Sequence, residues 1–305
     1  LASCTVGPDY ERPQFYPDAE VAKNLKLEQA EASPVGQDWY KQFNDPALNR
    51  LIERAWAASP NVRIAVHKLR EARYGLLRSN VQSFPMLDIN AGYNYDRSSR
   101  DIGFSIDRDY YQLGMDASWE LDIWGGNRRA AESSRALFEA AGANLDNVRL
   151  VMAAEVANNY ISLRTAQEQL RVARENLILQ QEIYQLVQQK YDVGLTDYIA
   201  LNQAQYAVES TKTLIPQLES EIEAYKNDVA VLLGVLPDDL AGTLDNTEDN
   251  LVRRRLSYNL KQLYRLRVDV IRNRPDVRLA EQNLIAQNAA VGEAVANLYP
   301  DVSIS

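Results

Sequence analysis

Two segments of this chain alternate apolar and polar residues with a period of two, and this pattern narrows the folds available to it. Residues 86–96 and 110–123 carry apolar or aromatic side chains at odd positions and mostly acidic, amide or small side chains at even positions. Such alternation predicts strands with one apolar face. The polar, charged stretch 97–108 between them predicts the turn of a hairpin.

A hairpin with one apolar face needs something to cover that face, because two strands are not stable alone in water. In a bilayer every backbone N–H and C=O must be paired, so strands persist there only in a closed barrel. Strands of about 9–11 residues are enough to cross. We therefore predict a barrel assembled from several subunits. The alternative is that Leu87, Ile89, Leu113 and their neighbours pack on the core of a soluble domain.

Aromatic residues lie near the ends of the two predicted strands. In a membrane barrel such residues form girdles at the two interfaces between lipid and water. The candidates for these interface anchors are Tyr93, Tyr95, Tyr110, Tyr111, Trp119 and Trp124. Residues 85–124 are thus predicted to form a transmembrane β-hairpin.

The longest helical pattern runs from Asn127 to Val193, with no proline and a single glycine. Apolar or small residues recur there at alternating spacings of three and four, as in a coiled coil. At 1.5 Å per residue this helix is about 100 Å long. Gly194 ends it, and a second helix from about 197 to Leu233 returns, with a kink expected at Pro216. Residues 127–234 therefore predict a long helical hairpin with its tip at 191–197.

The N-terminal residues Leu1-Ala2-Ser3-Cys4 have the form of a bacterial lipoprotein cleavage site. We expect residues 1–4 to be a signal remnant and Cys4 to carry a covalent lipid such as palmitate; no other cofactor is expected. A cysteine of no special role is the alternative. Residues 5–37 contain prolines and predict an extended strap. Residues 38–84 predict two helices, which begin at Asp45-Pro46 and Ser59-Pro60.

Acidic residues gather in the segment between Gly234 and Asn250. Their spacing fits no calcium-binding loop, so a solvated linker is favoured over a metal site. A short helical pattern follows from Leu256 to Ile271. We assign 235–273 to this linker and its helical segment.

The chain then repeats itself with an offset of 215 residues. Pro60-Asn61-Val62-Arg63-Ile64-Ala65 matches Pro275-Asp276-Val277-Arg278-Leu279-Ala280, and Phe84-Pro85 matches Tyr299-Pro300. The ungapped match continues through the change from helical to strand periodicity, which indicates a duplicated half-protein. Residues 274–305 are the predicted start of a second copy, in which the strands have only begun.

Composition and motifs argue against several classes of protein. A formal net charge of −9 disfavours nucleic acid as a partner. The chain contains no run of 18 apolar residues, so no membrane-spanning helix is predicted. The chain has no nucleotide-binding, serine hydrolase or zinc protease motif, and its single histidine, His67, has no sequence partner for a metal. We expect that the protein is not an enzyme and that it has no catalytic residues and no metal site.

Short motifs occur in order along nearly the whole chain: Leu1-Ala2-Ser3-Cys4 with Val6-Gly7-Pro8-Asp9-Tyr10, Trp39-Tyr40 with Asp45-Pro46, Glu120-Leu121-Asp122-Ile123-Trp124-Gly125, Lys190-Tyr191-Asp192-Val193-Gly194, Leu201-Asn202-Gln203-Ala204-Gln205, Leu232-Leu233-Gly234 and Arg274-Pro275-Asp276-Val277-Arg278. In order and spacing they resemble the TolC-type outer-membrane factors, in particular the OprM-like and NodT-like efflux lipoproteins.

The resemblance implies an α+β membrane protein that forms a homotrimer, with a twelve-stranded barrel of two hairpins per subunit and a helical tunnel in the periplasm. It implies a lipid-anchored channel of the bacterial outer membrane that passively exports drugs or other small molecules. These would arrive from an inner-membrane pump through a periplasmic adaptor (membrane fusion) protein. Residues 38–84 would supply an equatorial helix and the first tunnel helix. Three copies of this chain would lack half of the barrel, so we expect it to be a fragment.

Carried over by position, the periplasmic tip contains Lys190, Tyr191, Asp192, Gly194 and Asp197. The resemblance implies that Asp192 or Asp197 rings a closed gate and that Gly194 contacts the adaptor. The alternative is that both aspartates only cap the helix turn. For the whole chain, the rival interpretation is a lipid-anchored periplasmic adaptor or coiled-coil scaffold, which needs no amphipathic hairpin and no second copy of it. The sequence predicts no particular substrate or pump.

Overall fold

The computed structural model describes residues 5–12, 38–97, 101, 107–245 and 273–305. It divides into two compact units. The hairpin unit contains Leu1–Tyr16, His67–Asn144 and Arg272–Ser305, and the helical unit contains Pro17–Val66 and Leu145–Ile271. Two helices, α3 (Pro60–Val81) and α4 (Gly126–Asp192), contribute residues to both units. The predictions for Cys4, for residues 13–37 of the strap and for the helical segment 256–271 lie outside the described residues.

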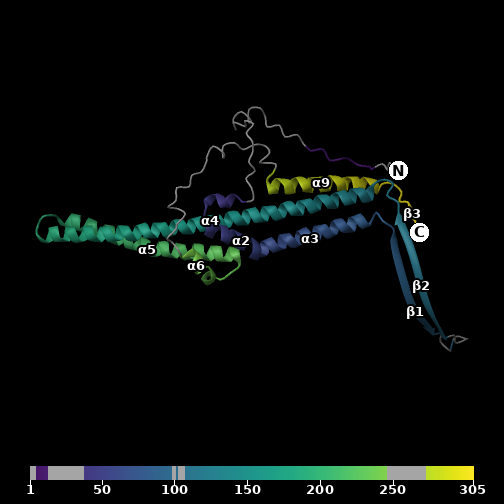
Figure 1. The fold of residues 1–305 in the computed structure, drawn as a ribbon, viewed down its shortest axis with the longest axis horizontal. Coiled ribbons are helices and arrows are strands. Elements are labelled where there is room, and N and C mark those ends of the chain that lie inside the picture. Colours follow the sequence, from purple (N-terminus) through teal and green to yellow (C-terminus); the bar gives the residue numbers. More distant parts are fainter. Residues whose placement is uncertain (1–4, 13–37, 98–100, 102–106, 246–272) are drawn as a thin grey trace, which may run out of the picture. The chain divides into compact units, whose positions relative to one another are not determined.

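The helical unit is built around an antiparallel pair of long helices, α4 and α5 (Tyr198–Leu233) (Figure 1). α4 is 67 residues long, which confirms the single long helix that the spacing of three and four predicts. α4 contains no proline, so each of its residues keeps a backbone N–H for the helix. α5 continues through Pro216 and ends at Gly234, which adopts a left-handed conformation with φ of 65°.

The core of the helical unit lies where α2 (Pro46–Ala58) packs with α4 and α5, beside the short helix η1 (Trp39–Phe43). Apolar residues spaced three and four apart on α2 place one face of that helix in the core. The largest fully buried side chains of this core are Tyr40, Leu48, Ile52, Val156, Tyr160, Leu163, Val229, Leu233, Leu240 and Leu244. Each such aliphatic side chain contributes roughly 1.5–3 kcal/mol on burial.

The start of the predicted acidic linker is folded rather than solvated. Residues after Gly234 form two short helices, η3 (Pro237–Leu240) and α6 (Ala241–Leu244). Leu240 and Leu244 are 0% and 1% exposed and belong to the core of the helical unit. The four-residue spacing of these two leucines puts both on one side of the chain, and their burial outweighs the preference of the neighbouring carboxylates for water.

A buried polar network joins α2, α4 and α6 inside the helical unit. The Asp45 carboxylate accepts hydrogen bonds from the backbone N–H groups of Ala47 (2.8 Å) and Leu48 (3.1 Å) and so caps α2. Its second oxygen accepts from the Tyr160 hydroxyl at 2.9 Å. One turn further along α4, the Arg164 guanidinium lies over the Tyr160 ring, 4.9 Å from its centroid.

Arg164 also holds the end of α6. Its Nη1 donates to the Leu244 carbonyl at 3.0 Å, and its Nη2 donates to the Thr243 carbonyl at 3.1 Å. The Gln167 amide donates to the same Leu244 carbonyl at 2.9 Å and accepts from Arg164 Nη1 at 2.8 Å. The last carbonyls of a helix have no partner within the helix. Arg164 and Gln167 satisfy them where water is excluded.

Burial makes the Tyr160 hydroxyl a probe of stability at high pH. Desolvation raises the pKa of Tyr160 to about 12, against about 10 in the unfolded chain. The stabilising contribution of the neutral phenol is therefore complete below pH 10. It is lost as the pH rises from 10 through 12, because the unfolded state ionises first; the loss reaches about 3 kcal/mol.

We expect the urea midpoint of the native protein to fall between pH 10 and 12 more steeply than that of Tyr160→Phe. The difference between the two curves isolates Tyr160 from the other tyrosines and lysines that titrate in this range. Parallel pH dependences for the two proteins would contradict the assignment.

The hairpin unit carries the predicted strands as a three-stranded sheet in the order β1 (Met86–Arg97), β2 (Asp107–Glu120) and β3 (Ser303–Ile304). β1 pairs with β2 in antiparallel register, with Ile89 opposite Met115 and Ala91 opposite Leu113. Every pair joins two odd or two even positions in this register. The apolar residues of both strands therefore share one face, as the alternation predicts.

The second repeat begins on the opposite edge of β2. Ile304 of β3 lies opposite Trp119, and the Leu121 N–H donates to the Val302 carbonyl at 2.8 Å. α9 (Pro275–Ala296) has the same length of 22 residues as α3, and both of its ends are shifted by the predicted 215 residues. The structure thus confirms the duplicated half-repeat.

Candidate functional site

The apolar face of the β1–β2 hairpin is uncovered in the described structure. Leu87, Ile89, Leu113 and Met115 are 60% or more exposed. Tyr93 and Tyr111 lie opposite each other on this face, with ring centroids 5.0 Å apart. A continuous exposed apolar face of this kind marks a surface that contacts another apolar phase or partner.

The strand register separates Tyr110 from the other predicted interface residues. Tyr110 lies opposite Asn94, at an even position, and so belongs to the polar face. Tyr93, Tyr95, Tyr111 and Trp119 occupy odd positions on the apolar face. The sequence already indicated this placement, because residue 110 is an even position and the even positions of the alternating pattern are polar.

The polar face of the hairpin is acidic. Asp88 lies directly opposite Asp116, and the Asn90 amide donates to the Asp116 carboxylate at 3.1 Å. Like charges placed directly across a strand pair are destabilising unless water or a counter-ion screens them. This face therefore suits an aqueous environment, in contrast to the face behind it.

Two tryptophans fix the base of the hairpin, where the strands meet the helices. Trp119 Nε1 donates to the Ser83 carbonyl at 3.3 Å. Trp124 stacks on Tyr299, with centroids 4.6 Å apart, and its Nε1 donates to the Pro300 carbonyl at 3.1 Å. Trp124 lies beyond the end of β2 and is half-buried. It joins the two repeats at this point.

The tip between α4 and α5 has a defined turn. Gly194 has φ of 76°, its N–H donates to the Tyr191 carbonyl at 2.9 Å, and the Leu195 N–H donates to the Lys190 carbonyl at 2.8 Å. These two bonds form a Schellman motif, in which glycine is favoured because the left-handed conformation costs it nothing. The turn leaves Val193 and Leu195 exposed.

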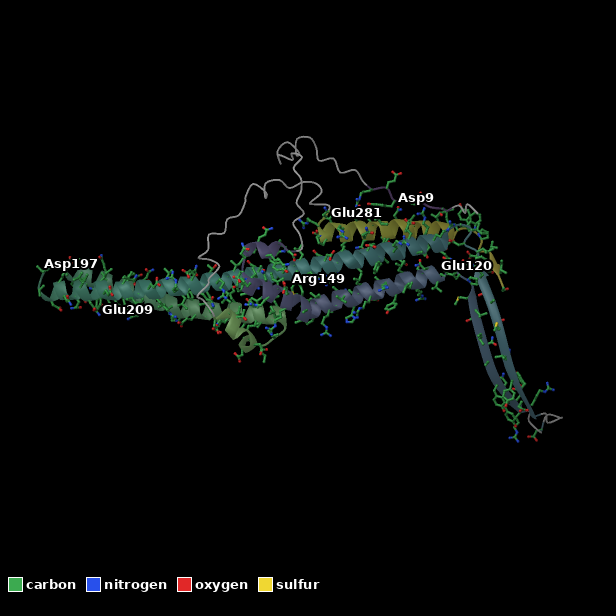
Figure 2. All side chains as sticks on the ribbon, in the orientation of Figure 1. Asp9, Glu120, Arg149, Asp197, Glu209 and Glu281 are labelled. Carbon is green, nitrogen blue, oxygen red and sulfur yellow. The ribbon has the colours of Figure 1, made fainter. Side chains whose placement is uncertain are left out.

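The predicted gate aspartates occupy different positions in this turn. Asp197 is the N-cap of α5 and accepts a hydrogen bond from the Ala200 N–H at 2.8 Å (Figure 2). Asp192 accepts from the Gln188 amide at 2.8 Å and ends α4. Lys190 and Asp192 are exposed, and the Tyr191 ring lies 6.1 Å from the Tyr198 ring. Asp197 thus caps α5, and the gate role stays a prediction for both residues.

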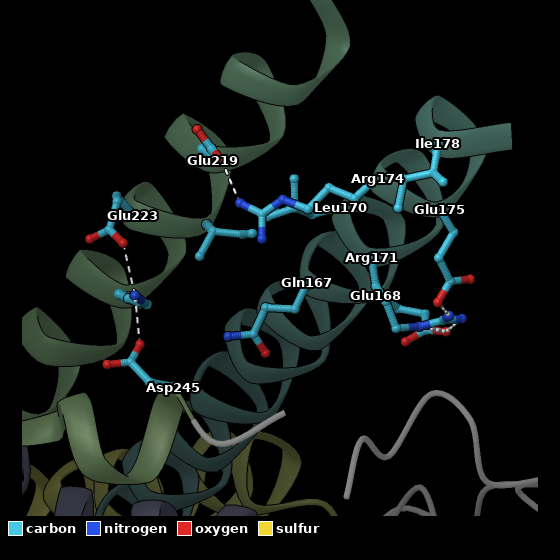
Figure 3. A pocket seen from close by; sticks show the side chains of 12 residues that line it. Gln167, Glu168, Leu170, Arg171, Arg174, Glu175, Ile178, Glu219, Glu223 and Asp245 are labelled. Carbon is cyan, nitrogen blue, oxygen red and sulfur yellow. Dashed lines mark hydrogen bonds and ion pairs between the residues drawn. The ribbon is translucent and has the colours of Figure 1, made fainter. Parts of the chain in front are cut away.

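A groove of about 650 Å³ lies between α4 and α5 in the helical unit, next to Asp245 (Figure 3). Its charged side chains pair with each other: Arg174 with Glu219 at 2.7 Å, and Lys226 with Asp245 at 2.7 Å. Dashed lines in Figure 3 mark these pairs. Each of the five carboxylates in the lining pairs with one of its three cations, so the charges of the groove are engaged with one another.

Two features are absent from the described part of the chain. No group of three or more histidine, cysteine, aspartate or glutamate side chains in it is arranged to hold a metal ion. Of the helices it contains, none is both long and apolar enough to cross a membrane.

The long helices and the strand hairpin form a fold that is similar to those of solved outer-membrane channels. The family model for outer membrane efflux proteins matches residues 51–235, more than half of the chain. The chain belongs to the outer membrane efflux protein family.

Among its relatives, the probable outer membrane lipoprotein SilC of Salmonella typhimurium is 29% identical over 314 aligned residues, which cover 100% of this chain and 65% of SilC. Nodulation protein T of Rhizobium leguminosarum bv. viciae is 27% identical and is covered over 61% of its length. The outer-membrane channel OprN has a similar structure, with a TM-score of 0.76 and 33% identity, over 98% of this chain and 66% of OprN. The chain therefore spans less than two thirds of the length of these relatives.

Proposed function

We propose that this chain is the greater part of one subunit of an outer-membrane efflux channel. Three subunits would close a twelve-stranded barrel from two hairpins each, and α4 and α5 would line a tunnel in the periplasm. The exposed apolar face of β1 and β2 carries this proposal. A lipid phase covers such a face without a further protein layer, and closure of the barrel pairs the free strand edges.

The proposed channel conducts water-soluble small molecules along the polar face of the hairpin. Asp88, Asp116 and Glu120 lie on that face. Repeated by three subunits, these carboxylates would form rings that favour cations over anions. The channel itself would be a passive conduit and would have no catalytic activity. An inner-membrane pump and a periplasmic adaptor would deliver the substrate at the helical tip.

A lipid on Cys4 would anchor the subunit beside the barrel. The Val6 N–H donates to the Trp124 carbonyl at 3.1 Å, at the base of the hairpin. Cys4 precedes Val6 by two residues, and two residues of chain reach about 7 Å at most. A lipid there would enter the leaflet that the strand bases meet. A lipid chain and a barrel together give stable attachment, whereas one acyl chain alone binds weakly.

Conductance of the full-length gene product in a planar lipid bilayer tests the proposal. We expect an oligomer of three subunits that resists dissociation in detergent, with single-channel currents that prefer cations. The rival interpretation, a lipid-anchored periplasmic adaptor or coiled-coil scaffold, predicts a protein that gives no currents and that needs no detergent once its lipid is absent. A purified oligomer that gives no conductance, either with or without the adaptor protein, would also contradict the proposal of a channel.

The same recordings test the gate at the tip. We propose that Asp192 rings the closed end, because its carboxylate accepts from the side chain of Gln188, whereas the Asp197 carboxylate accepts from the backbone of α5 as its cap. Asp192→Asn should raise the open probability several-fold, because it removes the carboxylates whose ion pairs and bound cations would hold the closed end together. Asp197→Asn is the matched control, since asparagine caps a helix as well as aspartate does. If the two substitutions changed the open probability equally, the proposed gate role of Asp192 would be contradicted.

A further inference from the structure

Residues 5–12, here called the clamp segment, lie along α9 and the start of α4 within the hairpin unit (Figure 2). Arg129 on α4 is the centre of this contact, and its side chain is 4% exposed. Its Nε donates to the Val6 carbonyl at 3.2 Å and its Nη2 to the Gly7 carbonyl at 3.3 Å. Nη2 also pairs with Asp9 at 2.7 Å, and Nη1 pairs with Glu132 at 2.8 Å.

The Arg129 guanidinium thus donates hydrogen bonds both to the backbone and to a side chain of the clamp segment. Hydrogen bonding to Asp9 and then to Glu132 raises the pKa of Arg129 further above its usual value. A buried guanidinium requires such partners, because desolvation opposes its charge. Lysine at this position would keep the charge but lose the planar fork that reaches several acceptors at once.

Two glycines allow the clamp segment to cross α9 at van der Waals distance. Gly7 has φ of 88°, and a Cβ atom added to it would overlap the Cα atom of Gly292. A Cβ atom added to Gly292 would lie 2.8–3.0 Å from three side-chain atoms of Arg129. Neither position therefore tolerates a side chain without displacing its neighbour.

The rest of the clamp segment follows one face of α9. The Asn288 amide donates to the Pro8 carbonyl at 3.0 Å. Arg12 donates to both carboxylate oxygens of Glu281, at 2.5 Å and 2.6 Å, and the Tyr10 hydroxyl donates to the same carboxylate at 3.3 Å. Positions 281, 288 and 292 are spaced seven and four apart, which places them in a single line along the helix.

The repeat-equivalent helix α3 lacks all three of these features. With the offset of 215 residues, Val66 stands at the position of Glu281, Arg73 at that of Asn288 and Leu77 at that of Gly292. Leu77 is 51% exposed on α3. Valine cannot accept hydrogen bonds from Arg12 and Tyr10. A leucine side chain would occupy the space that the Gly7 backbone fills beside Gly292.

We infer that the clamp segment recognises α9 and discriminates against α3, and that it thereby fastens the second repeat to the start of the first long helix. Arg129 is the positioning residue, and the Gly7–Gly292 crossing is the specificity determinant. The clamp segment then docks on one helix of the duplicated pair, α9, and not on its equivalent, α3. The clamp does not depend on channel activity, so its test and the conductance test fail separately.

Photo-crosslinking of the full-length protein tests this inference. We would replace Glu11, an exposed residue that the clamp contacts do not use, with p-benzoylphenylalanine. In the otherwise unchanged protein we expect cross-links to peptides of α9 and none to α3. Gly292→Leu, which introduces the residue of the α3 position, should reduce the yield about tenfold. Val291→Leu is the matched control one residue away and should leave the yield unchanged.

The circular dichroism of each variant has to match the parent protein, so that loss of folding is not scored as loss of docking. If Gly292→Leu fails to fold, the surface variant Asp9→Asn with Arg12→Gln replaces it and should reduce the yield similarly. An unchanged yield in a folded Gly292→Leu protein would overturn the specificity claim. Cross-links to α3 in the parent protein would overturn the clamp itself.

Discussion

Leu113→Arg in the full-length protein is expected to abolish the stable oligomer and its conductance. Leu113 is 81% exposed on the apolar face of β2, opposite Ala91 and near the middle of the hairpin. An arginine facing lipid at mid-membrane costs roughly 2–4 kcal/mol. Three subunits each carry the change, so the oligomer would lose roughly 6–12 kcal/mol. Outer-membrane fractionation and detergent-resistant oligomer on gels measure the effect.

Gln112→Arg is the matched control for this substitution. Residue 112 is the neighbour of Leu113 on the same strand, but it lies opposite Gly92 on the polar face. The same charge added there meets water, so we expect the oligomer to persist and its preference for cations to weaken. If both variants assembled normally, the apolar face would not contact lipid. A scaffold whose hairpin stays in water predicts that result.

The alternation of residues carried most of the sheet prediction, since parity alone assigns each side chain to a face. The prediction placed the end of the second strand at residue 123, whereas β2 ends at Glu120. The Asp122 carboxylate accepts from the backbone N–H groups of Asn127 (3.1 Å) and Arg128 (3.2 Å), and so starts α4 instead of extending the strand. Period-two patterning does not detect such a cap, because aspartate at an even position fits either role.

The clamp and the buried network could not be predicted, for a different physical reason. Both depend on contacts between residues far apart in the chain. Arg129 meets Asp9 across 120 residues, and Arg164 meets Leu244 across 80. Neither arginine disturbs the helical spacing of its neighbours, so each looks like part of a solvated helix face. The motif Val6-Gly7-Pro8-Asp9-Tyr10 is visible in the sequence, but its docking site on α9 lies about 280 residues further along the chain and leaves no local pattern.

Arg164→Met is expected to destabilise the helical unit by about 1–3 kcal/mol, the typical cost of leaving buried hydrogen-bond acceptors without a donor. Arg164 is 2% exposed and donates to the carbonyls of Thr243 and Leu244. Methionine fills similar volume but cannot donate a hydrogen bond, so these carbonyls would be left less well satisfied in the core. The loss should appear as a lower urea midpoint, measured by circular dichroism in detergent.

Arg174→Met, ten residues further along α4, is the matched control. Its side chain is 59% exposed and pairs with Glu219 at 2.7 Å. An exposed pair of this kind contributes about 0–1 kcal/mol, and salt screens it. We therefore expect a small loss for Arg174→Met that disappears at high ionic strength, and a large loss for Arg164→Met that does not. Equal, salt-sensitive losses would show that Arg164 acts as a surface charge and that the end of α6 is held by apolar burial alone.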